Sequence, residues 1–291
     1  MALLRPQWRD NMIKFTKMQG CGNDYIYINL IDQNIKNLER LAIEMSKRHF
    51  CVGADGIITI DKSKSCDFKM RIFNADGSEG NMCGNGVRCV GKYVYDNHLT
   101  DKKQITVETK SGVKTLDLHI TDDNTVDMVS VDMGKASFTP ESIPVYSKDP
   151  VIDREVVINN NKYNITAVSM GNPHSVIYIN DIDSLDLVSM GPYFENYKLF
   201  PERVNTEFVE KIGDNHFKMR VYERGSAETY ACGTGACAVA SASCKLGLAE
   251  FDKPIRVDLV GGTLYITVKP DFTVIMEGPA KRVYEGVYYE D

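Results

Sequence analysis

The sequence predicts an α+β fold with two pseudo-symmetric halves. Residues 68–90 align without a gap on residues 217–239 after a shift of 149 residues, and both copies begin with FKMR. An internal repeat of this kind indicates a duplicated fold unit. Strand-like runs outnumber helix-like runs along the chain, which is typical of α+β proteins and not of a doubly wound parallel sheet.

Each copy of the repeat begins with a predicted strand. Residues 68–73 and 217–222 alternate apolar and polar side chains, a pattern that fits a half-buried strand. Phe68, Met70 and Ile72 share one face in the first copy. A turn and a Cys-Gly-x-Gly sequence follow in both copies. The repeat therefore predicts a strand, a turn and then a helix.

Helix-like runs follow both turns. In the first copy, Val87, Val90 and Val94 recur at helical spacing. The second run, residues 236–247, is rich in Ala, Ser and Cys. Because small side chains surround it on all sides, we expect a tightly packed central helix wrapped by a sheet. Gly247 is a suitable stop for this helix.

Most of the remaining elements are predicted strands. The clearest amphipathic helix covers residues 38–50, with Leu38, Leu41, Ala42 and Met45 on one face. The alternation and the Gly- or Asn-rich turns predict further strands. These strands are expected at residues 105–109, 115–121, 128–134, 156–160, 163–171, 206–212, 255–268 and 273–278.

The chain is expected to divide into an extension and two halves. The extension covers residues 1–11 and receives no role. The N-terminal half covers residues 12–134 and is completed by the C-terminal segment 279–291. The C-terminal half covers residues 135–278. The boundary is expected near residues 134–150, where prolines break the strand pattern.

Composition and charge exclude several classes of protein. The formal net charge is −6 and no basic stripe is present, so nucleic acid and anionic membranes are poor partners. No apolar run approaches the roughly 18 residues needed to span a bilayer. The first residues lack the apolar core of a signal peptide, so we expect a cytoplasmic protein.

The eight cysteines are expected to be reduced thiols. They form no C-x-x-C pair, and the five histidines are not spaced beside them as zinc ligands would be. No structural metal site is therefore predicted. In a chain of this size without a secretory signal, reduced thiols in the cytosol are the expected state.

Cys83 and Cys232 occupy equivalent positions in the two copies. We expect each thiol at a helix start, where unpaired N–H groups and the helix dipole stabilise a thiolate and lower the pKa of the thiol. The glycines after each cysteine let a ligand approach the backbone closely. A substrate carboxylate could then bind the N–H groups of both helix starts.

Two such thiols suit proton exchange at an α-carbon. One thiolate removes the proton from one face while the opposite thiol delivers a proton to the other, so the stereochemistry inverts. The alternative is that both are buried apolar side chains, as most free cysteines are. Their matched turns, with Glu79 and Glu228 four residues earlier, favour catalysis. Those carboxylates also suit a helix N-terminus, whereas Cys89 and Cys237 are expected to pack.

Two other motifs were weighed against this hypothesis. Residues 233–238, GTGACA, fit the G-x-G-x-x-A dinucleotide pattern, but that motif needs a parallel strand-helix-strand context, which the sequence does not predict. Cys232 with His174 could form a hydrolase dyad, which leaves the Cys83 copy without a role.

Four motifs together resemble the diaminopimelate epimerase family. They are MQGCGNDY at residues 18–25, FNADGSEGNMCGNGVRC at 73–89, GNPHSV at 171–176 and ERGSAETYACGTGACA at 223–238. Their order and spacing match over nearly the whole chain from Met12 on. The resemblance implies that each half is a mixed, mostly antiparallel sheet wrapped around a central helix.

The resemblance also implies an activity. Members of this family interconvert LL- and meso-2,6-diaminopimelate, in lysine and peptidoglycan precursor synthesis, and need neither pyridoxal phosphate nor a metal. The expected partner is therefore this small-molecule substrate. The family is also compatible with a homodimer.

The resemblance assigns roles position by position. Cys83 and Cys232 become the acid/base pair, and His174 and Glu223 become groups that tune the pKa values of the thiols. Backbone N–H groups of the two turns are expected to hold the α-carboxylate, and side chains are expected to read the rest of the substrate. The implied substrate-binding residues are Asn23, Asn74, Gly84, Asn85, Asn172, Asn205, Glu223, Arg224, Gly233 and Thr234.

Several of these residues have a simpler alternative role. Asn23 and Asn172 each follow a glycine, where a turn-forming Asn is common, although their matched positions favour function. His174 on its own would be read as structural. At Gly56 some family members carry glutamine that contacts substrate, and this chain departs from them.

Two related activities remain as alternatives. One is a cofactor-independent racemase of another amino acid, such as proline, hydroxyproline or histidine. Relatives of proline racemase carry His after Cys-Gly, where this chain has Asn85. The other is a phenazine-type isomerase, which lacks the cysteine pair.

Overall fold

The computed structural model describes residues 12–290. The predicted extension, residues 1–11, lies outside them. The described chain forms two compact units. Unit 1 comprises the chain up to Val129 together with the segment from Pro279 on, and unit 2 runs from Ser130 to Gly278. The chain passes from one unit to the other within strand β8 (Val126–Lys135) and returns at the end of β17 (Thr273–Pro279).

Unit 1 has a mixed sheet. Strand β1 pairs antiparallel with both β18 and β2, β2 pairs parallel with β3, and β3 pairs antiparallel with β4. Strand β4 then pairs parallel with β6, which pairs antiparallel with β7. The elements are β1 (Met12–Gly20), β2 (Asn23–Asn29), α1 (Leu38–Met45), β3 (Gly56–Asp61), β4 (Phe68–Asn74), β5 (Glu79–Gly80), α2 (Gly84–Asp96), β6 (Gln104–Thr109), β7 (Gly112–Ile120) and β18 (Lys281–Tyr289).

Unit 2 repeats this pattern of strand directions. From β10 through β11, β12, β13 and β15 to β16, the successive pairings are antiparallel, parallel, antiparallel, parallel and antiparallel. The elements are η2 (Pro140–Ser142), β9 (Arg154–Ile158), β10 (Asn161–Ser169), β11 (Pro173–Tyr178), η3 (Ile182–Ser184), α3 (Leu187–Glu195), β12 (Asn205–Gly213), β13 (His216–Glu223), β14 (Ala227–Thr229), α4 (Gly233–Lys245), β15 (Pro254–Leu259) and β16 (Gly262–Val268).

The shift of 149 residues holds at the level of strand register. Ile58 on β3 lies opposite Ile72 on β4, and Glu207 on β12 lies opposite Val221 on β13. The duplicated sequence therefore gives two units with the same arrangement around their cysteine turns.

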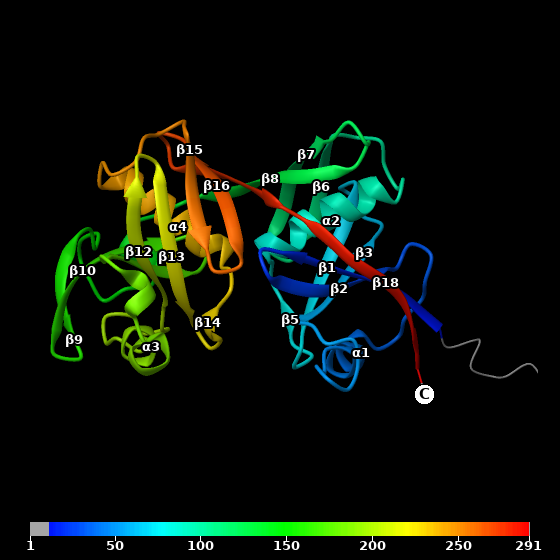
Figure 1. The fold of residues 1–291 in the computed structure, drawn as a ribbon, viewed down its shortest axis with the longest axis horizontal. Helices are drawn as coiled ribbons and strands as arrows, with labels where there is room; N and C mark the ends of the chain where they lie inside the picture. The colour runs from blue at the N-terminus through cyan, green and yellow to red at the C-terminus, as the bar shows by residue number, and fades with distance from the viewer. Residues whose placement is uncertain (1–11, 291) are drawn as a thin grey trace, which may run out of the picture. The chain divides into compact units, whose positions relative to one another are not determined.

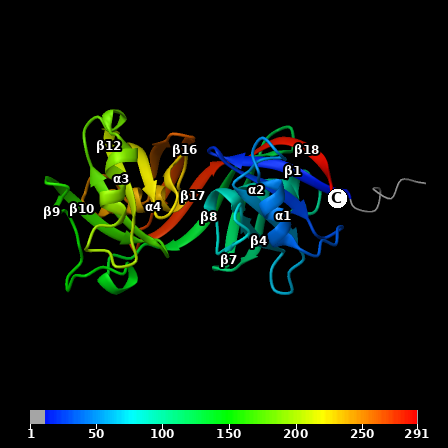
Figure 2. The same ribbon diagram turned by 90° about the horizontal axis from the view of Figure 1, so that it is seen from below.

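The predicted central helices are confirmed. Val87, Val90 and Val94 of α2 are fully buried. Every residue of α4 from Gly235 to Cys244 is buried, because Ala, Ser and Cys side chains let the surrounding strands approach on all sides. Figures 1 and 2 show α4 among the strands of its unit, and Gly247 follows it at φ +70°, where glycine is favoured.

The amphipathic helix is shorter than predicted. Leu38, Leu41, Ala42 and Met45 are its buried residues, as expected, but α1 ends at Met45 and residues 47–50 form a turn. Its apolar face packs in a cluster of buried side chains that includes β2 and β3. The predicted strands are present. The strands β1, β2, β3, β11 and β18, the short strands β5 and β14, and helix α3 were not anticipated.

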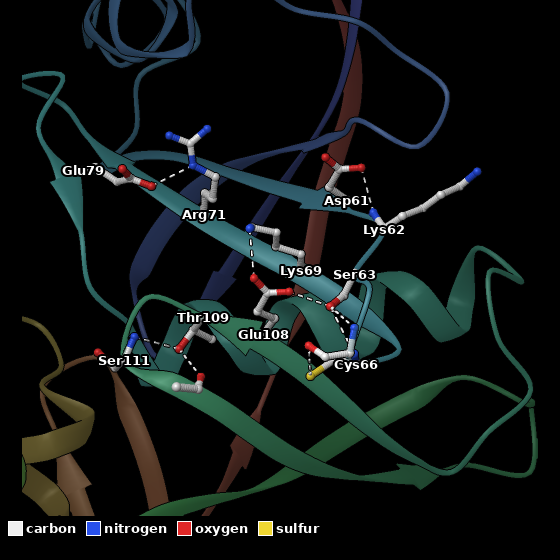
Figure 3. Close-up of polar contacts among 12 residues, drawn as sticks. Asp61, Lys62, Ser63, Cys66, Lys69, Arg71, Glu79, Glu108, Thr109 and Ser111 are labelled. Carbon is white, nitrogen blue, oxygen red and sulfur yellow. Dashed lines mark hydrogen bonds and ion pairs between the residues drawn. The ribbon is translucent and has the colours of Figure 1, made fainter.

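The carboxylates before the two cysteines belong to strands. Glu79 on β5 accepts a hydrogen bond from Nε of Arg71 at 2.7 Å, and Glu228 on β14 accepts one from Nε of Arg220 at 2.8 Å. Figure 3 shows the first pair beside the contact of Lys69 with Glu108. The expected placement at a helix N-terminus is therefore wrong: these ion pairs instead join the two strands ahead of each cysteine turn.

No helix among residues 12–290 is long and apolar enough to cross a membrane.

Candidate active site

Each unit has a cysteine at the start of its buried helix. Cys83 and Cys232 are the N-cap residues of α2 and α4, with extended backbone at φ −131° and −113°. In each case the sulfur accepts a hydrogen bond from the glycine N–H three residues later, Gly86 or Gly235, at 3.3 Å. The two thiols are thus held by the same capping geometry, which pairs one of the otherwise unpaired N–H groups of the helix start.

Glycine is required behind each thiol. A Cβ atom at Gly86 would lie 2.5 Å from Cδ1 of Ile58, and one at Gly235 would lie 2.8 Å from Oε1 of Glu207. The same strand position therefore closes over both helix starts, with an apolar side chain in unit 1 and a carboxylate in unit 2.

In unit 1 the Cys83 thiol contacts Asn23. The sulfur donates to Oδ1 of Asn23 at 3.1 Å, and Nδ2 of Asn23 donates to Oδ2 of Asp55 at 2.8 Å. Oδ1 of Asp55 accepts from Arg48 at 3.1 Å. Because a carboxylate only accepts hydrogen bonds, Asp55 holds the amide nitrogen and turns the amide oxygen toward the thiol.

The other candidate residues of unit 1 lie in the first turn of α2 and at the end of β4. Gly84 and Asn85 form the first turn of α2 and are buried, and Oδ1 of Asn85 accepts from Arg88 at 3.0 Å. Asn74, at the end of β4, donates to Oγ of Ser78 at 3.0 Å. Of these candidate residues, Asn23 lies directly against the Cys83 thiol.

The backbone around Gly56 leaves no room for a side chain. A Cβ atom at this position would lie 2.1 Å from the carbonyl oxygen of Phe73 and 3.0 Å from the ring of Tyr25. A larger side chain cannot be accommodated without moving the backbone of β4.

In unit 2 a chain of polar contacts leads from Glu207 to Cys232. Oε1 of Glu207 lies 2.6 Å from Nδ1 of His174, and Nε2 of His174 lies 3.0 Å from Oδ1 of Asn172. Nδ2 of Asn172 donates to Oγ1 of Thr234 at 3.4 Å, and that hydroxyl lies 3.5 Å from the Cys232 sulfur. Strands β12 and β11, the connection before β11, and helix α4 thus contribute to one network at the start of α4.

The remaining candidates of unit 2 form a second group. Asn205 donates to the carbonyl oxygen of Pro173 at 2.8 Å and accepts from the backbone N–H of Arg224 at 2.9 Å. Nη1 of Arg224 donates to the carbonyl oxygen of Glu202 at 3.0 Å. Glu223 accepts a hydrogen bond from the hydroxyl of Thr229. Gly233 begins α4 beside Cys232 and is buried.

The expected lowering of the thiol pKa is wrong for Cys232. Burial raises the pKa of this thiol well above its ordinary value, and the nearby carboxylates of Glu223 and Glu207 raise it further. The hydrogen bonds from Thr234 and Gly235 oppose the shift without overcoming it. These effects favour the neutral thiol of Cys232 over the thiolate.

The hydrolase dyad is also wrong. Both ring nitrogens of His174 are engaged, one with Glu207 and one with Asn172, and neither contacts Cys232. His174 is fully buried and cannot activate the thiol as an adjacent base would.

The expected absence of a parallel strand-helix-strand connection around residues 233–238 is wrong. β13 and β15 pair in parallel across α4, so a parallel strand-helix-strand connection does exist. Strand β14 intervenes before the helix, however, and the space behind Gly235 is filled by Glu207. The glycines therefore serve close packing around the cysteine.

Comparison with known proteins decides the family. The model of the family described as diaminopimelate epimerase matches residues 15–139 and 166–283. A diaminopimelate epimerase of Agathobacter rectalis is 51% identical over 283 residues, 94% of this chain and 98% of that protein. One of Methanococcus maripaludis strain C6 is 50% identical over 276 residues, 94% and 99% of the two chains. This chain belongs to the diaminopimelate epimerase family.

Solved structures confirm the predicted fold class. A hydroxyproline epimerase from Agrobacterium vitis matches with a TM-score of 0.69 at 11% identity, over 95% of this chain and 92% of that one. A Bacillus anthracis protein of the PhzF phenazine biosynthesis family matches with a TM-score of 0.68 at 17% identity, over 95% and 99%. At such identities the likeness shows the fold alone. Family and fold together indicate an isomerase.

Two residues that contact candidate site residues were not predicted from the sequence. Asp55 orients Asn23, and Glu207 contacts His174. A usable signal existed for Glu207: it lies in an apolar strand, and the equivalent residue of the other copy is Ile58. Among the described residues, no cluster of His, Cys, Asp and Glu suits a metal ion.

Proposed function

We propose that this protein is a diaminopimelate epimerase that interconverts LL- and meso-2,6-diaminopimelate by two-thiol proton transfer. The observation that carries the proposal is the identical capping of Cys83 and Cys232 in two units of the same fold. Relatives that are about half identical over most of the chain carry this name. With this activity we also propose a place in lysine and peptidoglycan precursor synthesis and a cytoplasmic location.

The mechanism requires that both thiols reach one α-carbon from opposite faces. A thiolate on one side takes the α-proton, and the thiol on the other side gives its own proton to the carbanion-like centre. The raised pKa of Cys232 makes it the proton donor at neutral pH. Cys83 then supplies the base for one stereoisomer, and the roles exchange in the reverse direction.

The N–H groups at the helix starts are proposed to hold the α-carboxylate. Gly84 and Asn85 begin α2, and Gly233 and Thr234 begin α4. A helix start presents N–H donors and the positive end of the dipole, which stabilise the carboxylate and the negative charge that develops beside it. No cofactor is needed for this step, because the backbone supplies the stabilisation.

Side chains that differ between the units are proposed to read the distal end of the substrate. Arg224 offers a planar fork for the distal carboxylate. Glu223 precedes it at the end of β13, and Asn205 at the start of β12 accepts a hydrogen bond from its backbone N–H. Asn74 and Asn172 complete the proposed set. Glu223 and His174 are proposed to act on the thiols: Glu223 through its charge near Cys232, and His174 through the contacts with Asn172 and Thr234.

The alternative on this fold is a racemase of another amino acid. A hydroxyproline epimerase and a probable proline racemase share this fold, which makes it the alternative to test. Asn85 stands against it, because relatives of proline racemase carry His at that place. Size-exclusion chromatography with light scattering tests the further proposal of a homodimer, against the 32.7 kDa monomer.

A substrate panel separates these activities. Purified protein without added cofactor is incubated with LL- and meso-diaminopimelate, L-proline and trans-4-hydroxy-L-proline, and the products are separated by chiral chromatography. We expect conversion of both diaminopimelate isomers and none of the other two compounds. Turnover of either proline compound without turnover of diaminopimelate would replace the proposal by the alternative.

A further inference from the structure

The asparagines beside the two cysteines present opposite ends of their amides. In unit 1, Asp55 holds the amide nitrogen of Asn23, so the oxygen faces Cys83. In unit 2, the oxygen of Asn172 faces His174, so the nitrogen faces Thr234 at the start of α4. These asparagines occupy equivalent positions in the repeat, yet their partners differ in kind.

The orientation of Asn172 depends on which ring nitrogen of His174 carries a proton. If Nε2 carries it, His174 donates to the Asn172 oxygen and the amide nitrogen points toward Thr234. If Nε2 is bare, it accepts, and the amide turns over to present its nitrogen to the ring and its oxygen to Thr234. An oxygen there would repel a substrate carboxylate bound at the start of α4.

Glu207 decides between these two states. Its carboxyl group and His174 are both fully buried, and their atoms lie 2.6 Å apart. If the carboxyl is ionised and the ring is charged, both ring nitrogens donate. If the carboxyl keeps a proton, it donates to Nδ1, and the neutral ring carries its proton on Nε2. Both distributions leave Nε2 protonated.

The third distribution, a carboxylate beside a neutral ring protonated on Nδ1, leaves a net negative charge without access to water. Burial opposes it and raises the pKa of Glu207. Oε2 of Glu207 has no hydrogen-bond partner among residues 12–290. The hydrogen bonds from His174 and from the backbone of Glu207 favour the carboxylate, but they do not outweigh its burial. Glu223 on β13 and the Cys232 thiol at the start of α4 also face this group, and Glu223 adds a further negative charge nearby.

We propose that Glu207 is a positioning residue that keeps Nε2 of His174 protonated and thereby holds the amide nitrogen of Asn172 toward the carboxylate-binding start of α4. The proposal rests on the function proposed above for its effect on substrate. The equivalent residue of unit 1, Ile58, has no such task, because Asp55 orients Asn23 directly. In unit 1 one carboxylate, that of Asp55, orients the asparagine, whereas in unit 2 Glu207 and His174 do so together.

Two substitutions separate positioning from packing. Glu207→Gln retains a side-chain N–H, and when this N–H donates to Nδ1 the ring proton of His174 stays on Nε2. Glu207→Leu has a similar volume and no polar atom, so His174 can adopt either tautomer and Asn172 can turn over. We expect kcat/KM for diaminopimelate within about 3-fold of wild type for the glutamine variant, and a loss of about 10- to 100-fold for the leucine variant, the range of an unsatisfied buried hydrogen bond.

Nitrogen-15 NMR of the histidine rings provides a reading that does not depend on activity. His174 is assigned with a His174→Gln variant. The wild type and Glu207→Gln should show a protonated Nε2, and Glu207→Leu should show a mixture of tautomers. Ile58→Val, which removes a methylene at the equivalent position of unit 1, controls for packing and should leave the His174 signals unchanged.

Several outcomes overturn the proposal. A bare Nε2 in the wild type does so by itself, and this measurement needs no variant, so a leucine variant that fails to fold leaves the test intact. Wild-type activity in a folded Glu207→Leu variant also overturns it. An equal loss of kcat/KM in Glu207→Gln and Glu207→Leu also overturns it. The negative charge of Glu207, and not the proton on Nε2 of His174, would then matter. If the wild type does not act on diaminopimelate, the proposed function fails, while the NMR result still decides the role of Glu207.

Discussion

The Cys83 thiol donates a hydrogen bond to Oδ1 of Asn23 at a distance of 3.1 Å. This contact links the first residue of β2 to the N-cap of α2, two elements of unit 1 that are far apart in the sequence. The amide is held from behind by Asp55. The Cys83 thiol is therefore positioned by a side chain whose own orientation is fixed by Asp55.

Loss of this contact should impair catalysis more than stability. Asn23→Ala removes the acceptor of the thiol proton and leaves Asp55 without one of its donors. We expect kcat/KM for diaminopimelate to fall about 10-fold, in line with one hydrogen bond of roughly 1 kcal/mol or slightly more. Asn34→Ala, at an exposed position, is the control and should match wild type. Equal activity of the two variants would remove Asn23 from the proposed site.

Arg224 should affect recognition of the distal carboxylate. Arg224→Lys keeps the charge but loses the planar fork that binds two oxygens at once. We expect KM for diaminopimelate to rise about 10-fold while kcat changes by less than about 3-fold, because Arg224 is proposed to bind the far end of the substrate and not the reacting carbon. Steady-state kinetics decide the matter. A fall confined to kcat would place Arg224 at the α-carbon instead.

The Cys232 thiol should be slow to alkylate at neutral pH. Its pKa is raised by burial and by two carboxylates, so the reactive thiolate forms only at alkaline pH. With iodoacetamide and mass spectrometry, the modification rate of Cys232 should rise steadily from pH 7 to pH 9 without a plateau. Glu223→Gln removes one negative charge, lowers the pKa of Cys232 and should increase the rate at pH 7 several-fold. A plateau near pH 7 in the wild type would contradict the raised pKa.

Buried thiols should make the protein less stable at alkaline pH. Burial raises the pKa of Cys89 from the ordinary 9.0 to about 11. Between these values the unfolded chain loses a proton that the folded chain keeps, so the free energy of unfolding falls by about 1.4 kcal/mol per pH unit. This contribution is fully present below pH 9 and is lost as the pH rises through 11.

Urea unfolding of two variants at pH 8 and pH 11 isolates this effect. The destabilisation caused by Cys89→Ala should shrink by roughly 2 kcal/mol at the higher pH, because the variant lacks the titrating thiol. Val90→Ala, a neighbouring buried change without an ionisable group, should destabilise equally at both pH values. A destabilisation by Cys89→Ala that does not change with pH would contradict the raised pKa of Cys89.

Repetition made much of the fold predictable. The matched strands, cysteine turns and helices follow from one shift of the sequence, and the small side chains of α4 indicated its burial. Strand β18 was not anticipated, because its side chains are mostly exposed and lack a clear buried face. Helix α3 was missed as well, and Pro192 lies inside it, where a sequence pattern would predict a break.

The electrostatics of the site were harder to predict. The sequence pattern places Cys232 at a helix start, where the helix dipole is expected to lower the pKa of a thiol. Burial of the thiol and the approach of Glu207 from β12 depend on tertiary packing, and they outweigh the dipole. The contact of His174 with Glu207 joins residues from neighbouring parallel strands, whose pairing the sequence does not reveal.

The most direct test of the two-thiol mechanism follows deuterium in single-cysteine variants. Purified protein is incubated in deuterium oxide with LL-diaminopimelate, and isomers and masses are read by chiral chromatography with mass spectrometry. Wild type should form the meso isomer with one solvent deuterium at the α-carbon. Cys83→Ala and Cys232→Ala should each lose at least about 100-fold in this conversion, the lower range for a general acid or base, while Cys66→Ala should not. Conversion at the wild-type rate in either of the first two variants would contradict the mechanism.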